Sequence, residues 1–165
     1  MTTIASQLSG ELQRLAGTCT PTTVAIADPR VAELFVDFSV VDRLSCSFSD
    51  LRLNVPSLQS AHIDDLERWG NDLCGRITYL LENIRPLEVD KAGSQLLIRS
   101  TPPDEQREST KFYEIVLKSH AFGSFSLRRY ASDLGKFGRV PVDIQLTHEV
   151  MLKLVSDLMN RACRR

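Results

Sequence analysis

Residues 31–55 read VAELFVDFSVVDRLSCSFSDLRLNV, and hydrophobic side chains recur in this stretch at every second position. Such alternation predicts β-strands with one buried face. In the first run this face holds Leu34, Val36, Phe38 and Val40. The second run alternates through Leu44, Cys46 and Phe48 and resumes through Leu51, Leu53 and Val55. The odd step from Phe48 to Leu51 predicts a bulge or break at Ser49-Asp50, because a regular strand would turn one half of the run to the wrong face.

The segment before this stretch predicts a helix and then a loop. Over residues 1–17 one helical face is apolar, and Gly17 stands where glycine commonly ends a helix. The apolar residues are Ile4, Leu8, Leu12 and Leu15. Residues 18–30 hold two prolines and four threonines, which favours a loop.

The longest helical pattern in the chain follows the two strands and covers residues 61–84. Its apolar residues include Leu66, Leu73, Ile77, Leu80 and Ile84. Ser60 is a suitable N-cap, acidic residues complement the dipole in the first turns, and Pro86 would stop the helix. Gly70 and Gly75 would each cost about 1 kcal/mol relative to alanine unless a neighbour packs closely against them.

The second half of the chain predicts short strands and a final helix. The strands are expected at residues 87–89, 95–100, 112–118, 124–130 and 140–146. The segment 101–110 (TPPDEQREST) predicts a mobile loop. The last helix is expected to begin with Thr147 as its N-cap, while Leu146 and Met151 form a hydrophobic staple.

This element order, α-β-β-α-β-β-β-β-α or the same order with one strand split in two, predicts an α+β fold. Helices and strand runs are segregated and the strand links are short, which favours an antiparallel sheet of about five to seven strands with helices packed mainly on one face. Residues 1–165 are expected to form a single domain. The element order is similar to that of small secretion chaperones, which are dimeric and bind extended partner segments. This similarity concerns topology alone and assigns no residue.

Charge is unevenly distributed along a chain whose net charge is only -1. Residues 1–110 carry 10 basic and 16 acidic side chains, and residues 111–165 carry 10 basic and 5 acidic ones. We expect the two segments to attract each other within the fold or across a dimer; the alternative is a basic surface for an anionic partner. The start of the chain lacks the pattern of a signal peptide and no apolar run could span a membrane, so a cytoplasmic location with reduced cysteines is expected.

The residues that could carry chemistry form no recognised motif. No glycine-rich phosphate loop is present. His62, Asp64 and Asp65 share one helical turn and could touch a metal ion, although acidic residues at that helix end also have a capping explanation. His148-Glu149, His120, Cys46 and Cys74 could join a site only through long-range folding. The sequence therefore predicts no cofactor and no metal ion.

Basic and aromatic residues are concentrated between residues 122 and 139. The strongest candidates for partner binding there are Arg128, Tyr130, Lys136, Phe137 and Arg139. Such a set could bind nucleic acid through stacking and phosphate contacts. The favoured interpretation is a solvated outer face on which the arginines lie over apolar surface.

A second apolar face is also predicted, since Phe35, Val41, Phe112 and Val116 lie off the main buried faces of their strands. Helices would have to cover this face, or a partner would. The leading interpretation is a non-catalytic cytoplasmic binding protein, chaperone-like and homodimeric, whose partner is another protein or a second copy, with no membrane association. The alternatives are an enzyme whose site is assembled only in three dimensions, and a nucleic-acid-binding module using residues 122–139.

Overall fold

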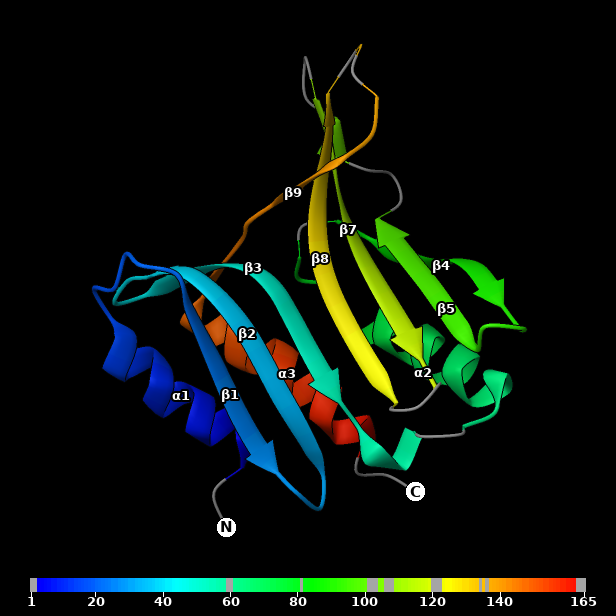
Figure 1. Cartoon of the computed structure of the whole chain (residues 1–165), viewed down its shortest axis with the longest axis horizontal. Coiled ribbons are helices and arrows are strands. Elements are labelled where there is room, and N and C mark those ends of the chain that lie inside the picture. Colours follow the sequence, from blue (N-terminus) through cyan, green and yellow to red (C-terminus); the bar gives the residue numbers. More distant parts are fainter. Residues whose placement is uncertain are drawn as a thin grey trace.

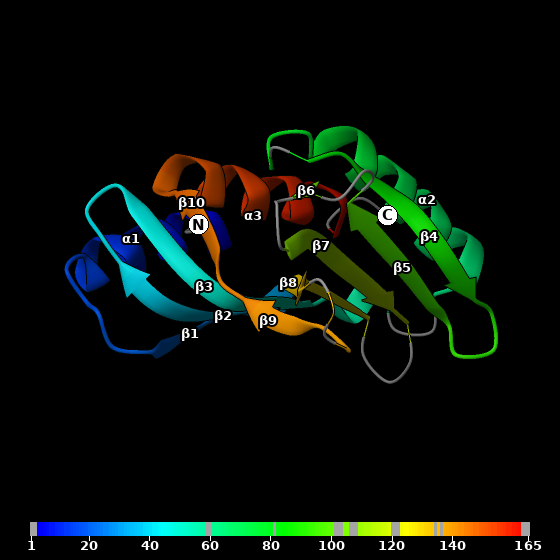
Figure 2. The same ribbon diagram turned by 90° about the horizontal axis from the view of Figure 1, so that it is seen from above.

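The computed structural model describes residues 3–58, 61–80, 82–100, 104–105, 109–119, 123–133, 135 and 137–162. The described strands form one antiparallel sheet, and the helices α1 (Ile4–Leu15), α2 (Ile63–Arg76) and α3 (His148–Ala162) pack on one side of it (Figures 1 and 2). The strands are β1 (Thr22–Asp28), β2 (Ala32–Val41), β3 (Ser45–Asn54), β4 (Ile84–Asp90), β5 (Gln95–Ser100), β6 (Asp104–Glu105), β7 (Ser109–Lys118), β8 (Ser124–Asp133), β9 (Val140–Val142) and β10 (Ile144–Thr147). The predicted α+β class is confirmed.

Seven strands run across the width of the sheet in the order β1-β2-β3-β8-β7-β5-β4. Three short strands lie off this path, where β10 pairs with β3, β6 with β7 and β9 with β8. The core lies between the sheet and the helices, because the buried side chains of the strands and the apolar stripes of the helices form one cluster. The face of the sheet that points away from the helices is called the open face below.

The bulge predicted in the second strand is present. Asp50 pairs with Asp37 and Phe48 with Phe38, so Ser49 has no partner residue on β2. Phe48 and Leu51 consequently both reach the core despite their odd spacing.

A second register shift follows on β2 itself, between Phe38 and Val40. It returns Val41 to the core, where this residue is buried. The prediction that Val41 belongs to a second apolar face is therefore wrong, since the extra residue on β2 changes the phase of the alternation.

Residues 18–30 were expected to form a loop, and this prediction is wrong for most of the segment. Thr22–Asp28 form the edge strand β1, which pairs with β2 over its whole length. Only two buried apolar residues, Val24 and Ile26, mark the strand. Pro21 and Pro29 lie just outside the ladder, where a missing N–H costs nothing.

The helix expected at residues 61–84 is shorter at both ends. His62 is the N-cap, and its ring Nδ1 accepts a hydrogen bond from the Asp64 N–H; Ser60 lies outside the described residues. The helix ends at Arg76, and the Ile77 N–H donates to the Leu73 carbonyl as its last bond. Leu80 and Ile84 are nevertheless buried, because the chain continues along the same core after it has left the helix.

The predictions for the second half fit the structure with two differences. The β4–β5 and β7–β8 hairpins form as expected, and the Thr147 hydroxyl caps α3 by accepting from the Val150 N–H. The segment 140–146 divides into β9 and β10, which pair with different strands. Residues 101–103 and 106–108 of the expected mobile loop lie outside the described residues, and Asp104–Glu105 form β6.

The two glycines of α2 give a matched pair of stability predictions. A Cβ at Gly70 would collide with the Leu96 side chain of β5, whereas a Cβ at Gly75 would meet nothing within 4 Å. We expect Gly75→Ala to raise the free energy of unfolding by up to about 1 kcal/mol, because alanine favours the helix. Gly70→Ala should be neutral or destabilising, since Leu96 must move. Urea denaturation of both variants checks this, and an equal gain for both would contradict the close contact at Gly70.

Candidate binding face of the sheet

Polar side chains form one continuous row of cross-strand neighbours on the open face. The strand register places one residue of each of the seven strands in this row. From β1 to β4 the row contains Thr23, Asp37, Asp50, Arg128, Glu114, Arg99 and Arg85. No described helix lies over this row, as Figure 2 shows.

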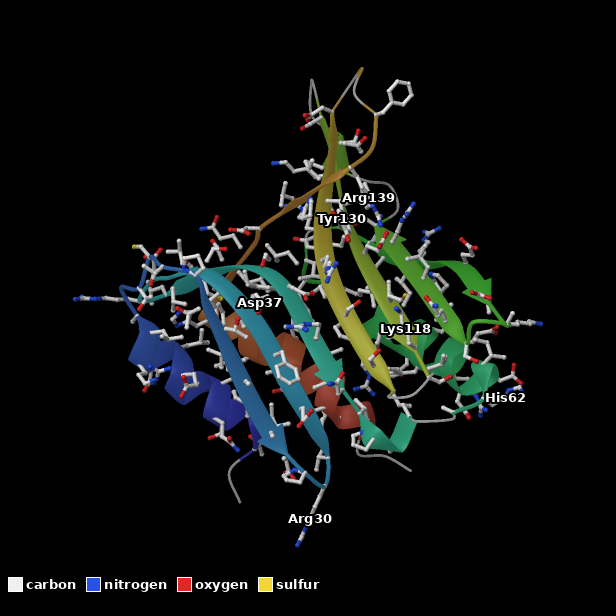
Figure 3. All side chains as sticks on the ribbon, in the orientation of Figure 1. Arg30, Asp37, His62, Lys118, Tyr130 and Arg139 are labelled. Carbon is white, nitrogen blue, oxygen red and sulfur yellow. The ribbon has the colours of Figure 1, made fainter. Side chains whose placement is uncertain are left out.

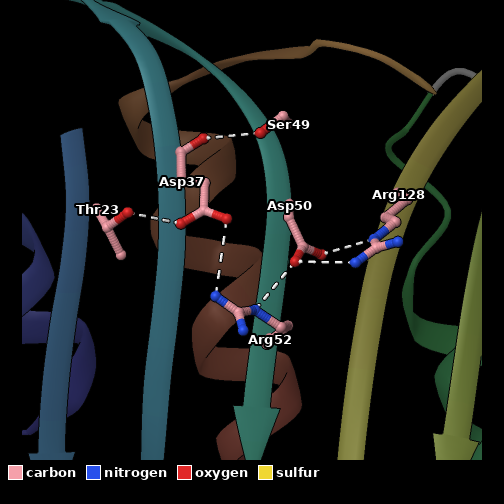
Figure 4. A network of polar contacts seen from close by, with 6 residues as sticks. All are labelled: Thr23, Asp37, Ser49, Asp50, Arg52 and Arg128. Atoms are coloured by element: carbon pink, nitrogen blue, oxygen red, sulfur yellow. Dashed lines mark hydrogen bonds and ion pairs between the residues drawn. The ribbon is translucent and has the colours of Figure 1, made fainter. Parts of the chain in front are cut away.

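Asp50 is the centre of the first of two ion-pair clusters in the row (Figure 4). The Arg128 Nε and Nη2 atoms lie 3.2 and 3.4 Å from the two Asp50 oxygens, and the Arg52 Nε lies 2.9 Å from Oδ2. Arg52 also approaches Asp37 at 3.7 Å, and Asp37 accepts a hydrogen bond from the Thr23 hydroxyl. Asp50 is only 7% exposed. Two arginines therefore cover and neutralise a buried carboxylate.

Glu114 is the centre of the second cluster and is likewise 7% exposed. The Arg99 Nε donates to Glu114 Oε2 over 3.1 Å. Arg139 donates to both Glu114 oxygens, through Nη1 to Oε2 and through Nη2 to Oε1. Hydrogen bonding to the carboxylates raises the pKa of the Arg128 and Arg139 guanidinium groups, so both remain charged.

Aromatic rings support three of the four arginines. The Arg139 guanidinium lies 4.0 Å from the centre of the Tyr130 ring, and Figure 3 shows these two side chains together above β8. Arg52 lies over Phe35 at 5.4 Å and Arg99 over Phe112 at 5.2 Å. Ring stacking and carboxylate contacts restrict the arginine rotamers, while the side chains stay between 37% and 49% exposed.

The first cluster lies where the sheet forks. One edge of β3 pairs with β10 up to Phe48 and with β8 from Leu51 onward. Beyond that point β8 pairs with β9 instead, and the β9–β10 segment crosses between the two branches (Figure 1). The bulge at Ser49 occupies this fork, and it turns the Asp50 side chain to the open face beside Arg128.

The structure brings together three of the five residues predicted to bind a partner. Arg128, Tyr130 and Arg139 lie on the open face, whereas the Phe137 side chain is fully exposed to solvent. Lys136 lies outside the described residues.

Sequence reasoning missed the carboxylates Asp50 and Glu114 and the arginines Arg52 and Arg99. The signal that could have identified them was their position, because each lies on the outward face of a strand whose inward face holds core residues.

The uneven charge distribution along the chain is balanced partly by ion pairs within the fold. Arg128 binds Asp50, and Arg129, which points to the core side, binds Glu82, whose side chain is 7% exposed, at 2.8 Å. Both contacts join the basic segment 111–165 to the acidic segment 1–110. This agrees with the expected attraction between the two segments.

The remaining candidates from the sequence lie apart from the open face. His62 is an exposed helix cap beside Asp64, and Asp65 pairs with Arg68. Figure 3 shows His62 at a distance from Tyr130 and Arg139. Among the described residues no group of three potential ligands could hold a metal ion.

The histidine and cysteine candidates for catalysis are likewise separated. The His148 ring Nε2 lies 3.1 Å from the Ser45 carbonyl, while the neighbouring Glu149 is exposed. Burial raises the pKa of the Cys46 thiol to about 12 and also raises that of Cys74, which makes both poor nucleophiles at neutral pH. His120 lies outside the described residues.

Comparisons with known proteins add no relative, since no family model, no curated protein and no solved structure matches the chain. Within the described part of the chain, no helix is long and apolar enough to span a membrane.

Proposed function

We propose that this chain is a non-catalytic cytoplasmic binding protein whose open face docks an acidic segment of a protein partner. The observation that supports the proposal most is the group of four partly exposed arginines in the two ion-pair clusters of the open face, each bound to a buried carboxylate. A guanidinium has five N–H donors, and each contact described above uses one or two of them. The remaining N–H groups of each guanidinium can therefore bind carboxylates of a partner.

The spacing of the arginines fits an extended segment. Arg128 and Arg99 lie in one row with Glu114 between them, so their backbones are two strands, or about 10 Å, apart. Because cross-strand contacts fix the side chains in advance, little rotamer entropy would be lost when a partner binds. Partly exposed apolar residues of the neighbouring row, Val116 and Leu97, would add contact area.

Nucleic acid is the less suitable ligand for this face. Base stacking requires open aromatic faces, whereas arginines occupy the rings of Phe35, Phe112 and Tyr130. Asp37, Asp50 and Glu114 also offset most of the positive charge, and the whole chain carries a net charge of -1. Long-range attraction is therefore weak for any anionic ligand, and an acidic protein segment would be bound through direct contacts to the guanidinium groups.

Peptide binding tests the proposal. The probe is a fluorescent peptide of alternating glutamate and serine, with a glutamine-serine peptide as its neutral control. We expect the acidic peptide alone to bind, and Arg99→Gln to weaken it about tenfold, which is about 1.4 kcal/mol. Glu114 keeps Arg139 in this variant, so the fold should survive. The matched control is Arg30→Gln, at the exposed tip of the β1–β2 hairpin.

Two results would contradict this proposal. One is equal or absent binding of the two peptides by the wild type. The other is submicromolar binding of mixed single-stranded RNA at about 150 mM salt that is lost in Arg128→Ala/Arg139→Ala, since nonspecific complexes are normally weaker at that salt. The second result would favour the nucleic-acid alternative.

A further inference from the structure

The two outer edges of the sheet differ in how well they are protected against pairing. Natural edge strands are blunted by proline, charged side chains and bulges. The edge strand β4 has all three, namely Pro86, a register shift between Pro86 and Glu88, and the charges of Arg85, Glu88 and Asp90. Its edge is therefore unsuited to another strand.

The opposite edge strand, β1, has neither proline nor a register shift within its ladder and carries a single charge. Its sequence TTVAIAD contains no proline and no basic residue, and its one charge, Asp28, is at the end. All seven residues pair with β2 without a register shift. No other strand among the described residues pairs with the outer edge of β1. About half of the backbone N–H and C=O groups of an edge strand point to that outer edge.

The boundaries and side chains of β1 suit pairing with an identical strand. Pro21 and Pro29 flank the ladder and limit it to the seven residues between Thr22 and Asp28. An antiparallel pair of two such strands is centred on Ala25. Its cross-strand neighbours are then Val24 with Ile26, Thr23 with Ala27, and Thr22 with Asp28.

This register brings no like charges together and places small side chains opposite each other on the open face. Thr23, Ala25 and Ala27 are exposed there, while Val24 and Ile26 are already buried against their own helix layer. A foreign strand would need no particular charge to fit this neutral edge, whereas a second copy supplies the matching length and register by symmetry.

We infer that the chain forms a two-fold dimer in which β1 pairs antiparallel with β1 of a second copy, centred on Ala25. The sheets of the two copies become one continuous sheet, and both open faces stay uncovered. One pair of seven-residue strands is a small interface, so a dissociation constant in the micromolar range is expected. The inference concerns the strand edge and does not depend on the proposed function of the open face.

Charge variants at the symmetry axis test this dimer by sedimentation equilibrium over a range of concentrations. Only pairing centred on Ala25 places residue 25 opposite itself, so Ala25→Lys and Ala25→Glu should each weaken self-association at least about tenfold by like-charge repulsion. An equimolar mixture of the two variants should restore the dimer as a mixed species. Val89→Lys on β4 is the matched control and should dimerise like the wild type. Because Ala25 is exposed, circular dichroism should show the native fold in both variants.

Any of four results would overturn the inference. The wild type could remain monomeric at every concentration, Ala25→Lys could dimerise undiminished, or the mixture of the two charge variants could remain monomeric. Dissociation caused by Val89→Lys alone would place the contact on β4 and would also overturn it. Peptide binding through Arg99 is measured separately, so the failure of one proposal leaves the other standing.

Discussion

Replacing Arg52 and Arg128 together by methionine is expected to lower the free energy of unfolding by about 3 kcal/mol, the lower end of the cost of leaving a buried charge without its partner. Both arginines bind Asp50, which is 7% exposed because their side chains cover it. Methionine preserves much of this cover but removes the charge. The Asp50 carboxylate would then be neither solvated nor neutralised. Urea denaturation with a common m-value for all variants measures the loss.

The single variants and a triple variant are the controls for this prediction. Arg52→Met and Arg128→Met alone should each cost about 1 kcal/mol or less, because one guanidinium stays on Asp50. Adding Asp50→Leu to the double variant should recover most of the lost stability, since an apolar set of similar volume replaces the ion pairs. Additive effects of the two single substitutions, or no recovery in the triple variant, would contradict the shared role of the arginines.

The parts of the fold that were predicted correctly depend on local rules. The bulge at Ser49 follows from a change of phase within a single strand, and the cap at Thr147 from one turn of helix. The errors arise where a local pattern has two physical causes. Ile77 and Ile84 continue the helical spacing of α2 and are buried, but Ile77 lies just after the helix and Ile84 lies in strand β4. The strand β1 was missed because threonine is common in both strands and loops.

The candidate site was only partly predictable for a different reason. Arg128, Tyr130 and Arg139 are close in the sequence, so composition alone indicated them. Their carboxylate partners come from other strands, and the contact between Arg128 and Asp50 spans 78 residues. It requires β3 to lie beside β8, a pairing of strands that are not consecutive in the chain. No property of residues 122–139 specifies that neighbour.

Leu73→Ala and Ile77→Ala are each expected to lower the free energy of unfolding by roughly 2–5 kcal/mol, the usual range for truncating a buried aliphatic side chain. Both residues are at most 1% exposed and belong to the core cluster between the sheet and the helices. The two sites differ in one respect, because Leu73 lies inside α2 and Ile77 is its C-cap. A loss at Leu73 alone would mean that the segment after Arg76 is loosely packed.

Thr78→Ala is the matched control for these two variants, since Thr78 is exposed and follows Ile77 directly. Its substitution should change the stability by less than about 0.5 kcal/mol, as at most surface positions. A difference in stability between Ile77→Ala and Thr78→Ala would therefore come from the burial of the Ile77 side chain. Thermal or urea melts that show near-native stability for both core variants would contradict the packing of α2 and its C-terminal extension on the sheet. The assignment of the open face would then be wrong as well, because that face is defined as the one opposite the packed helices.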